Sequence, residues 1–300
     1  MKFKATTLHM MICVAFMIMT NVTTAFAQKY RVAACDWMML KRQKLGEFQL
    51  AKTIGADGIE MDMGPLGKRP QFDNKLRDRH FQQLFRHTAD SLGIEVPSVA
   101  MSGFFAQSLI TRDNWRDLVA DCLKTMDVMG AKVAFLPLGG SGREWQTMTG
   151  EPYNTLVARL HEAGEMARRE GKTIALRTGM DARHTKRMLA DVDSKGVKAY
   201  FNLQDAVDQG LDPSTELRIL GRRRIAQIHA SLTDSVTLDR DTRIDMPAVK
   251  RTLDRMGWSG WLVVERSRDV SRVRDVKYNF STNVAYLKRL FQEKETINKN

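Results

Sequence analysis

Two residues that could exchange protons with a substrate each close a short apolar run in the second half of the chain. His229 closes IAQIH, and Glu265 closes WLVVE. Because side chains alternate along a strand, His229 shares a face with Gln227, and Glu265 shares one with Val263. A carboxylate that directly follows an apolar run is costly to bury unless a cation, a metal or a hydrogen-bond donor meets it. We therefore take Glu265 and His229 as candidate acid and base residues.

Both residues also have a purely structural interpretation. A histidine at the end of a buried strand can be a core residue whose hydrogen bonds are satisfied. Glu265 can pair with a nearby arginine, Arg266 or Arg268, outside any site. The functional interpretation therefore depends on whether the strands end where a fold builds its binding sites.

An arginine closes a third apolar run, TIALR, at position 177. A turn at Thr178-Gly179 follows, and a helix is predicted to begin near Asp181. Because a guanidinium is always protonated, Arg177 cannot bind a metal, but it can hold a carboxylate or phosphate through two hydrogen bonds. A structural pair with Glu265 and a grip on an anionic substrate oxygen are both compatible with this position. Asp181 and His184 could supply a further acid or base, although an exposed helical position explains His184 equally well.

The elements that must position these residues follow a repeated local pattern. An amphipathic helical stretch ends in glycine, and an apolar strand-like run follows it. Glycine takes the left-handed conformation just past a helix end at little cost. The glycines of this pattern are Gly55, Gly93, Gly130, Gly171, Gly196, Gly221 and Gly257.

With YRVAACD at residues 30–36 as the first strand, the pattern predicts eight strands that alternate with helices. Runs such as VAFLPL are apolar without alternation, as expected for parallel strands buried on both faces. This arrangement predicts an α/β fold, a single-domain (β/α)8 TIM barrel over residues 28–300. A doubly wound open sheet is the alternative.

Barrel enzymes build their sites at the carboxyl ends of the strands, so the remaining strand ends are candidates for substrate binding. We expect Asp36, Trp37, Glu60, Gly140 and Asn202 to contact the substrate. The glycine-rich loop at 139–142 could cradle a phosphate through its N–H groups, or be an ordinary loop. Trp37 and Trp145 would suit stacking on a sugar, and a core position suits them equally.

The first residues have the organisation of a secretory signal peptide. Lys2 and Lys4 precede an apolar stretch from Met10 to Met19, and an A-x-A cleavage site ends at Ala27. This stretch is too short to span a bilayer as a helix, so a membrane anchor is disfavoured. We therefore predict a signal peptide at residues 1–27 and export, to a bacterial periplasm. Cys35 and Cys122 lie in apolar runs and are predicted to be buried free thiols.

The chain is basic, with a formal net charge of +12. A basic surface favours anionic partners, and sugar acids are among them. The densest basic run, Arg222-Arg223-Arg224, precedes a strand and is interpreted as a solvated loop. Together with the predicted export, this favours a small carbohydrate or sugar acid as partner and not nucleic acid.

The chain resembles the xylose isomerase-like TIM-barrel superfamily of sugar phosphate isomerases and epimerases, most specifically in its second half. The segments IALRTGMDA, VKAYFNLQDAV, IAQIHASLTDS and GWLVVERSR are similar to its strands five to eight in order, and the resemblance extends from about Arg31 to Phe291. In ketose-epimerase-like members, the resemblance implies one Mn²⁺, Mg²⁺ or Co²⁺ held by a glutamate, an aspartate, a histidine and a glutamate on these strands. The matching positions are Arg177, Asn202, His229 and Glu265.

Two of these four positions depart from the family pattern. Arg177 reverses the charge of a ligand, and Asn202 is a weaker ligand than a carboxylate. A dication would face a fixed positive charge at short range. We therefore predict no cofactor, and the family's metal is disfavoured by Arg177.

Two functional hypotheses remain. The first is an exported isomerase, epimerase or lyase of a sugar or sugar acid, in which Glu265 is the base, His229 the acid or orienting group, and Arg177 the electrostatic stabiliser. The second is a non-catalytic carbohydrate-binding barrel. An endonuclease IV-like nuclease needs several metal-ligating histidines, aspartates and glutamates. This chain has six histidines; one of them (His9) lies in the predicted signal peptide and only one, His229, closes a strand, which argues against a nuclease. The sequence determines neither the substrate nor the oligomeric state.

Overall fold

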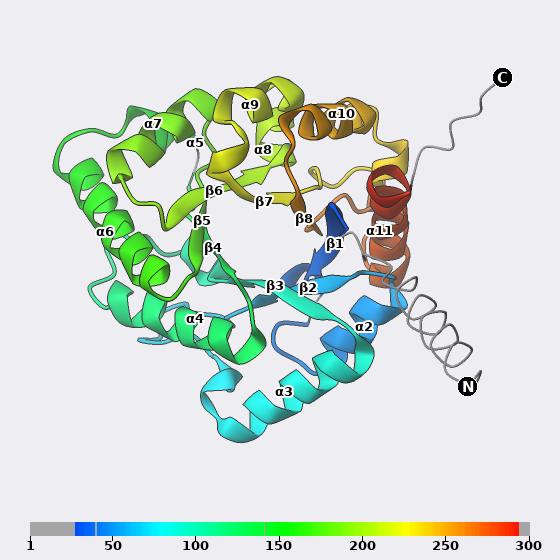
Figure 1. The fold of residues 1–300 in the computed structure, drawn as a ribbon, viewed down its shortest axis with the longest axis horizontal. Helices are drawn as coiled ribbons and strands as arrows, with labels where there is room; N and C mark the ends of the chain where they lie inside the picture. Colours follow the sequence, from blue (N-terminus) through cyan, green and yellow to red (C-terminus); the bar gives the residue numbers. More distant parts are fainter. Residues whose placement is uncertain (1–27, 40, 141, 294–300) are drawn as a thin grey trace, which may run out of the picture.

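The computed structural model describes residues 28–39, 41–140 and 142–293 (Figure 1). The predicted signal peptide, residues 1–27, lies outside the described residues, as does Ser141 of the glycine-rich loop. Within the described part of the chain, no helix is long and apolar enough to cross a membrane.

Eight parallel strands close into a barrel in sequence order, so the predicted (β/α)8 architecture is confirmed. The barrel closes where Val32 of the first strand pairs with Leu262 of the last, which rules out the open-sheet alternative. The strands are β1 (Tyr30–Cys35), β2 (Gly58–Asp62), β3 (Glu95–Ala100), β4 (Val133–Pro137), β5 (Thr173–Arg177), β6 (Val197–Asn202), β7 (Ile225–His229) and β8 (Gly260–Val264).

Helices surround the barrel as an outer layer (Figure 1). The α-helices are α2 (Gly46–Thr53), α3 (Arg79–Leu92), α4 (Trp115–Met129), α5 (Gly142–Thr147), α6 (Gly150–Arg169), α7 (Ala182–Val192), α8 (Leu203–Asp208), α9 (Pro213–Leu220), α10 (Met246–Met256) and α11 (Val276–Gln292). Short 3-10 turns are η2 (Trp37–Met39), η3 (Lys75–Arg77), η4 (Ser102–Phe105), η5 (Arg222–Arg224), η6 (Leu238–Arg240) and η7 (Val270–Arg272).

The glycines of the helix–strand rhythm serve two different purposes. Gly93 follows α3 with a φ of 65° and Gly257 follows α10 with a φ of 63°, the left-handed geometry expected of a helix end. Gly196 is needed for space instead, because a Cβ atom there would lie 1.9 Å from the carbonyl oxygen of Gly164 in α6. The same residue type thus ends some helices and allows the close approach of another helix.

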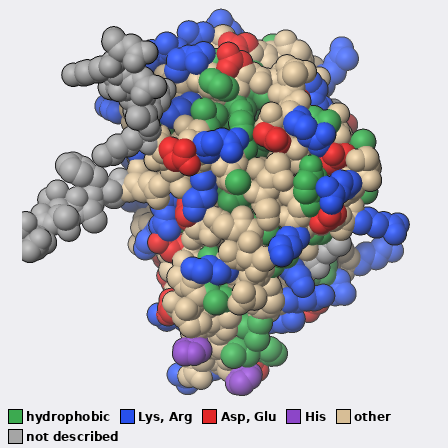
Figure 2. Space-filling model, turned by 90° about the vertical axis from the view of Figure 1, so that its right-hand side faces the viewer, with side chains coloured by type: hydrophobic (Ala, Val, Ile, Leu, Met, Phe, Trp, Pro, Cys, Tyr) green, Lys and Arg blue, Asp and Glu red, His purple; other side chains and the backbone are tan. Residues whose placement is uncertain are grey.

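The core has two layers, one between strands and helices and one inside the barrel. Inside the barrel, Phe135 and Tyr200 pack edge to face with ring centroids 4.8 Å apart. Cys35 and Cys122 are both buried free thiols, as predicted. On the face shown in Figure 2, Lys and Arg side chains are interspersed with Asp and Glu.

Candidate active site

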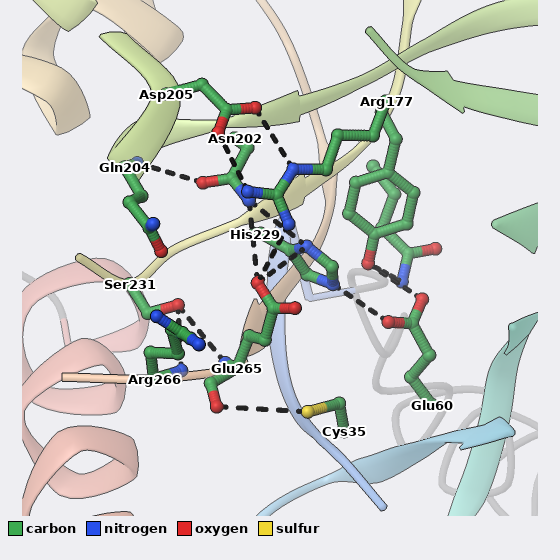
Figure 3. Close-up of polar contacts among 12 residues, drawn as sticks. Cys35, Glu60, Arg177, Asn202, Gln204, Asp205, His229, Ser231, Glu265 and Arg266 are labelled. Carbon is green, nitrogen blue, oxygen red and sulfur yellow. Dashed lines mark hydrogen bonds and ion pairs between the residues drawn. The ribbon is translucent and has the colours of Figure 1, made fainter. Parts of the chain in front are cut away.

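The side chain of Arg177 lies at the carboxyl end of β5 between two carboxylates (Figure 3). Its Nε and Nη2 donate to the two carboxylate oxygens of Asp205 at 3.0 and 2.7 Å. Its Nη1 lies 3.4 Å from Oε2 of Glu265. The guanidinium carbon also lies 5.4 Å from the ring centre of Phe105, within the range of a cation–π contact. Arg177 is therefore held on three sides, and its strongest partner is Asp205.

The charge of Arg177 is fixed by these neighbours. Burial alone would lower the pKa of Arg177, but the negative charges of Glu265 and Asp205 outweigh burial and raise that pKa above its usual value. The side chain is 14% exposed, so it remains reachable from solvent. The site therefore contains a permanent cation supplied by the protein.

Glu265 directly follows β8 and is almost fully buried, with 4% of its surface exposed. Burial raises the pKa of Glu265, but the nearby charges of His229 and Arg177 lower it further than burial raises it, so the pKa lies below its usual value. Glu265 is thus held ionised and available as a proton acceptor. Of its two predicted alternative partners, Arg268 pairs with Asp234 instead, at 2.6 Å.

His229 connects Glu265 to a second buried carboxylate. Its Nε2 lies 2.8 Å from Oε1 of Glu60, and its Nδ1 lies 3.4 Å from Oε2 of Glu265. The ring is fully buried and lies against Tyr200, with ring centroids 4.3 Å apart. This arrangement fixes the orientation of the imidazole and places it to orient Glu265.

Glu60 lies deep inside the barrel, where buried side chains hydrogen-bond both of its carboxylate oxygens. Its Oε2 accepts hydrogen bonds from Ser98 Oγ at 2.6 Å and from Tyr200 at 2.8 Å. Gln227 donates to both of these hydroxyl groups and completes the network. Glu60 is fully buried, so the structure gives it a role beneath the site, oriented toward His229.

Asn202 ends β6 and caps α8 with its side chain. Its Oδ1 accepts a hydrogen bond from the backbone N–H of Gln204 at 2.9 Å. Its Nδ2 lies 3.5 Å from both Glu265 Oε2 and His229 Nδ1. The amide therefore presents its donor to the site and uses its oxygen for the helix.

An open pocket of about 500 Å³ lies above these residues, between the ends of β4, β5 and β6. Arg177 and Asp205 form part of its wall, as do Phe105, Gly140 and Asp208. Gly140 has a φ of 60°, and a Cβ atom there would lie 2.4 Å from Glu144 Oε2. The pocket is large enough for a monosaccharide, whereas Glu265 and His229 lie below its described wall.

A second group of carboxyls lies at the ends of β1 and β2. Burial, followed by repulsion from Glu47 and Asp62, raises the pKa of Asp36 well above its usual value. Burial also raises the pKa of Glu47 to about 8 and that of Asp62 to about 6. One oxygen of each of the three side chains is buried without a hydrogen-bond partner among the described residues. The structure thus places Asp36 in a buried carboxyl cluster apart from Arg177.

The two tryptophans considered for sugar stacking are both 8% exposed. Trp37 lies inside the barrel, stacked on Phe135 with ring centroids 5.9 Å apart. Trp145 donates from Nε1 to the carbonyl of Gly139 at 2.7 Å and so supports the loop that carries Gly140. Their positions shape the site from beneath and beside it.

The region after β5 confirms the predicted helix start. Asp181 caps α7 by accepting from the backbone N–H of His184 at 2.9 Å. The same two side chains also pair with each other at 2.7 Å. Asp181 and His184 are therefore engaged locally at the start of α7.

The sequence interpretation missed Asp205, which is the main partner of Arg177. It lies three residues beyond the end of β6, in the first turn of α8. The signal for it in the sequence was a carboxylate about one helical turn after Asn202, the residue that ends the strand. At that spacing the carboxylate lies on the side of the helix that faces the barrel mouth. Nothing in that spacing identifies which cation it would meet.

These donors do not fit the family's divalent metal. A guanidinium occupies the space between Glu265 and Asp205, and the oxygen of Asn202 is used by the helix cap. Among residues 28–39, 41–140 and 142–293, no group of three or more His, Cys, Asp or Glu side chains has the arrangement of a metal site.

Comparison with solved structures supports the same architecture. D-psicose 3-epimerase with D-tagatose from Clostridium cellulolyticum H10 superposes with a TM-score of 0.70 and 14% identity, over 88% of this chain and 100% of that one. 3-Keto-D-glucoside 4-epimerase from E. coli superposes with a TM-score of 0.66 and 16% identity, over 87% and 99%. A xylose isomerase domain protein from Planctomyces limnophilus gives 0.65 and 17%, over 88% and 96%. At these identities the likeness is one of fold.

Comparison with curated proteins gives no significant match. The family model described as xylose isomerase-like TIM barrel matches residues 48–290, which is most of the chain. The family resemblance of strands five to eight is thereby confirmed, and this chain belongs to the xylose isomerase-like TIM barrel family.

Proposed function

We propose that this protein is an exported, metal-independent isomerase or epimerase that acts on a sugar or sugar acid at the pocket beside Arg177. The observation that carries the proposal is the position of the Arg177 guanidinium between Glu265 and Asp205, at 3.4 and 2.7 Å. A protein cation there provides the positive charge that the family's metal supplies in other members.

The reaction class requires a proton to leave and return at a carbon beside a carbonyl group. Glu265 is ionised and can accept that proton once a bound sugar displaces the contact from Arg177. The guanidinium then donates hydrogen bonds to the enolate oxygen as negative charge develops on it. Glu265 can then return the proton to the neighbouring carbon, which completes an isomerisation, while Asp205, 18% exposed in the pocket wall, holds the guanidinium in place.

His229 acts in this proposal as a positioning residue. Glu265 and His229 both lie below the pocket wall, but Glu265 contacts Arg177 of that wall. The fully buried His229 instead contacts Glu265 and Glu60, so His229 orients Glu265 and does not contact the substrate. The hydrogen bond that His229 Nε2 donates to Glu60 fixes the imidazole ring. Loss of this ring should therefore change the rate more than the affinity.

The test is solvent deuterium incorporation. The chain from Gln28, treated with a chelator, is incubated in D₂O with the sugars that the similar structures are named for, D-psicose and D-tagatose, and with matched aldoses and uronic acids. Proton NMR then follows loss of the C–H signal next to the carbonyl. Exchange that needs Glu265 and Arg177, and that added Mn²⁺ leaves unchanged, supports the proposal.

Matched variants separate the roles. Glu265→Gln should abolish exchange while sugar binding persists, because it removes the proton acceptor and little volume. Arg177→Met should lower the exchange rate about 100-fold or more, the usual effect of losing one oxyanion donor. Exchange that appears only with added metal would contradict the proposal.

The second candidate is a non-catalytic carbohydrate-binding barrel. It is favoured by one observation: Glu265 and His229 are 4% and 0% exposed and lie below the pocket wall. In this case sugars bind, as measured by saturation-transfer NMR, without any deuterium incorporation.

Export is a separate part of the proposal and rests on Lys2, Lys4 and the A-x-A site that ends at Ala27. Expression of the full chain in a bacterial host should give a periplasmic product whose N-terminus, by Edman degradation or mass spectrometry, is Gln28. A cytoplasmic product that keeps Met1 would contradict it.

A further inference from the structure

The opposite end of the barrel from Arg177 contains a basic hollow. It has a volume of about 500 Å³ and lies at the amino-terminal ends of β4 to β7. These four strands are neighbours in the barrel (Figure 1). The hollow includes part of the Arg222-Arg223-Arg224 run, which the proposed function does not use.

Four cationic side chains line this hollow, and none of its described lining residues is acidic. Lys132 precedes β4, Lys198 lies in β6, and Arg222 and Arg223 lie in η5. Within residues 28–39, 41–140 and 142–293, Lys132, Lys198 and Arg223 have no side-chain hydrogen bond or ion pair, and Arg222 has one contact at 3.4 Å to the carbonyl of Gly257. The positive charges are therefore not neutralised by the described protein.

Two carboxylates near this end of the barrel, Asp127 and Asp254, are already engaged. Asp127, in the last turns of α4, pairs with Lys172 at 2.6 Å. Asp254, near the end of α10, pairs with Lys29 and Lys250 at 2.5 and 2.7 Å. These acids cannot also compensate the four cations of the hollow without giving up those partners.

Lys198 distinguishes this hollow from an ordinary basic rim. Helices end at this side of the barrel, and cations at helix ends are favoured by the helix dipole. Lys198 lies in a strand instead, on the same interior side as Tyr200 and Asn202, because side chains alternate along β6. It is half-buried, next to Val133 and Ala226 of the barrel interior. Its side chain has no described anionic partner, so an anion that enters the hollow can pair with it.

We propose that this hollow binds a multivalent oxyanion, a phosphate ester or a pyrophosphate-like group. Four like charges that face one hollow repel one another, and a multivalent anion relieves that repulsion at several of them at once. Arg222 and Arg223 provide forked donors that match phosphate oxygens, and Lys198 provides a point charge at the base. The site is independent of the sugar pocket.

The test uses inorganic pyrophosphate and isothermal titration calorimetry on the chain from Gln28 at low salt. We expect one site whose affinity falls steeply with added salt. Lys198→Met should weaken binding at least tenfold, and Arg222→Ala/Arg223→Ala should do the same. The matched control is Arg79→Ala/Arg86→Ala, which removes the same charge from the exposed face of α3 and should leave the affinity unchanged.

Several results decide the matter. No binding by the wild-type chain, or an equal loss in the control, would overturn the proposal, since net charge alone would then explain any affinity. If Lys198→Met does not fold, the exposed Lys132→Met replaces it and should weaken binding about threefold or more. Sedimentation with phosphatidylglycerol vesicles that pyrophosphate reverses identifies a lipid headgroup as the source, and pyrophosphate binding without sedimentation identifies a soluble phosphate.

Discussion

Arg177 and Asp205 form a two-point ion pair, with Nη2–Oδ1 and Nε–Oδ2 distances of 2.7 and 3.0 Å, whereas the contact from Arg177 to Glu265 is a single one at 3.4 Å. The fork of the guanidinium matches a carboxylate in only one plane, so Arg177 cannot hold both acids equally well. Asp205 therefore sets where the cation lies relative to Glu265. The geometry makes Asp205 as important to the site as the residues that end the strands.

Replacing Asp205 by asparagine should move Arg177 toward Glu265 and destabilise the fold. The two side chains are 14% and 18% exposed, so this ion pair is intermediate in burial. A surface ion pair contributes under about 1 kcal/mol to stability, and breaking a buried one costs about 3–5 kcal/mol. We expect Asp205→Asn to lower the free energy of unfolding by about 2 kcal/mol, measured by urea denaturation. Asp208→Asn, an exposed acid on the same pocket wall, is the control and should change it by less than about 0.5 kcal/mol.

Restoring the family's carboxylates should create a metal site. The double variant Arg177→Glu/Asn202→Asp removes the cation and places two carboxylates beside His229 and Glu265. We expect about one Mn²⁺ per chain after dialysis, measured by elemental mass spectrometry, and far less in the wild-type protein. Arg177→Gln, which removes the cation but adds no carboxylate, should remain largely metal-free. Stoichiometric metal in the wild-type chain would show that the charge argument fails.

The buried carboxyl of Glu47 should make stability depend on pH. A carboxyl whose folded pKa is raised contributes stability that is complete below its unfolded pKa and is lost as pH rises through the folded pKa. For Glu47 the two values are 4.5 and about 8, so the free energy of unfolding should fall as pH rises between them. One proton corresponds to at most about 1.4 kcal/mol per pH unit.

Urea denaturation from pH 5 to pH 8 measures this slope. Glu47→Gln should make it clearly shallower, because glutamine does not titrate, whatever its effect on stability at a single pH. Asp36 and Asp62 also have raised pKa values and should leave part of the slope in place. Glu151→Gln, at an exposed position of α6, is the control. An unchanged slope in Glu47→Gln would mean that the Glu47 carboxyl is not protonated in the fold.

Two glycines of the same sequence pattern should respond differently to alanine. Gly196→Ala places a Cβ atom 1.9 Å from the carbonyl oxygen of Gly164, so the strand or helix must move. We expect a loss of about 3 kcal/mol or more in the free energy of unfolding. Gly93→Ala meets nothing within 4 Å and should cost only the left-handed strain, about 1 kcal/mol. Thermal denaturation of both variants measures the difference, and equal costs would contradict the packing argument.

The sequence by itself determined the barrel and which residues share its mouth. Both follow from local rules: glycine ends helices, apolar runs form buried strands, and parallel strands end on the same side. Arg177, His229 and Glu265 could therefore be placed together although they are distant in the chain. The fixed positive charge at position 177 was also readable, because the charge of an arginine does not depend on its surroundings.

The tertiary structure alone decided how these residues are paired. His229 meets Glu60 across 169 positions, and Arg177 meets Asp205 rather than mainly Glu265. Side-chain direction within a loop or a first helical turn depends on packing from several elements, which no local pattern encodes. Burial likewise raises the pKa of Glu47, and the hollow around Lys198 is basic because none of the described residues that line it is acidic. Desolvation and charge pairing are properties of three-dimensional neighbours, so they enter only when the chain is folded.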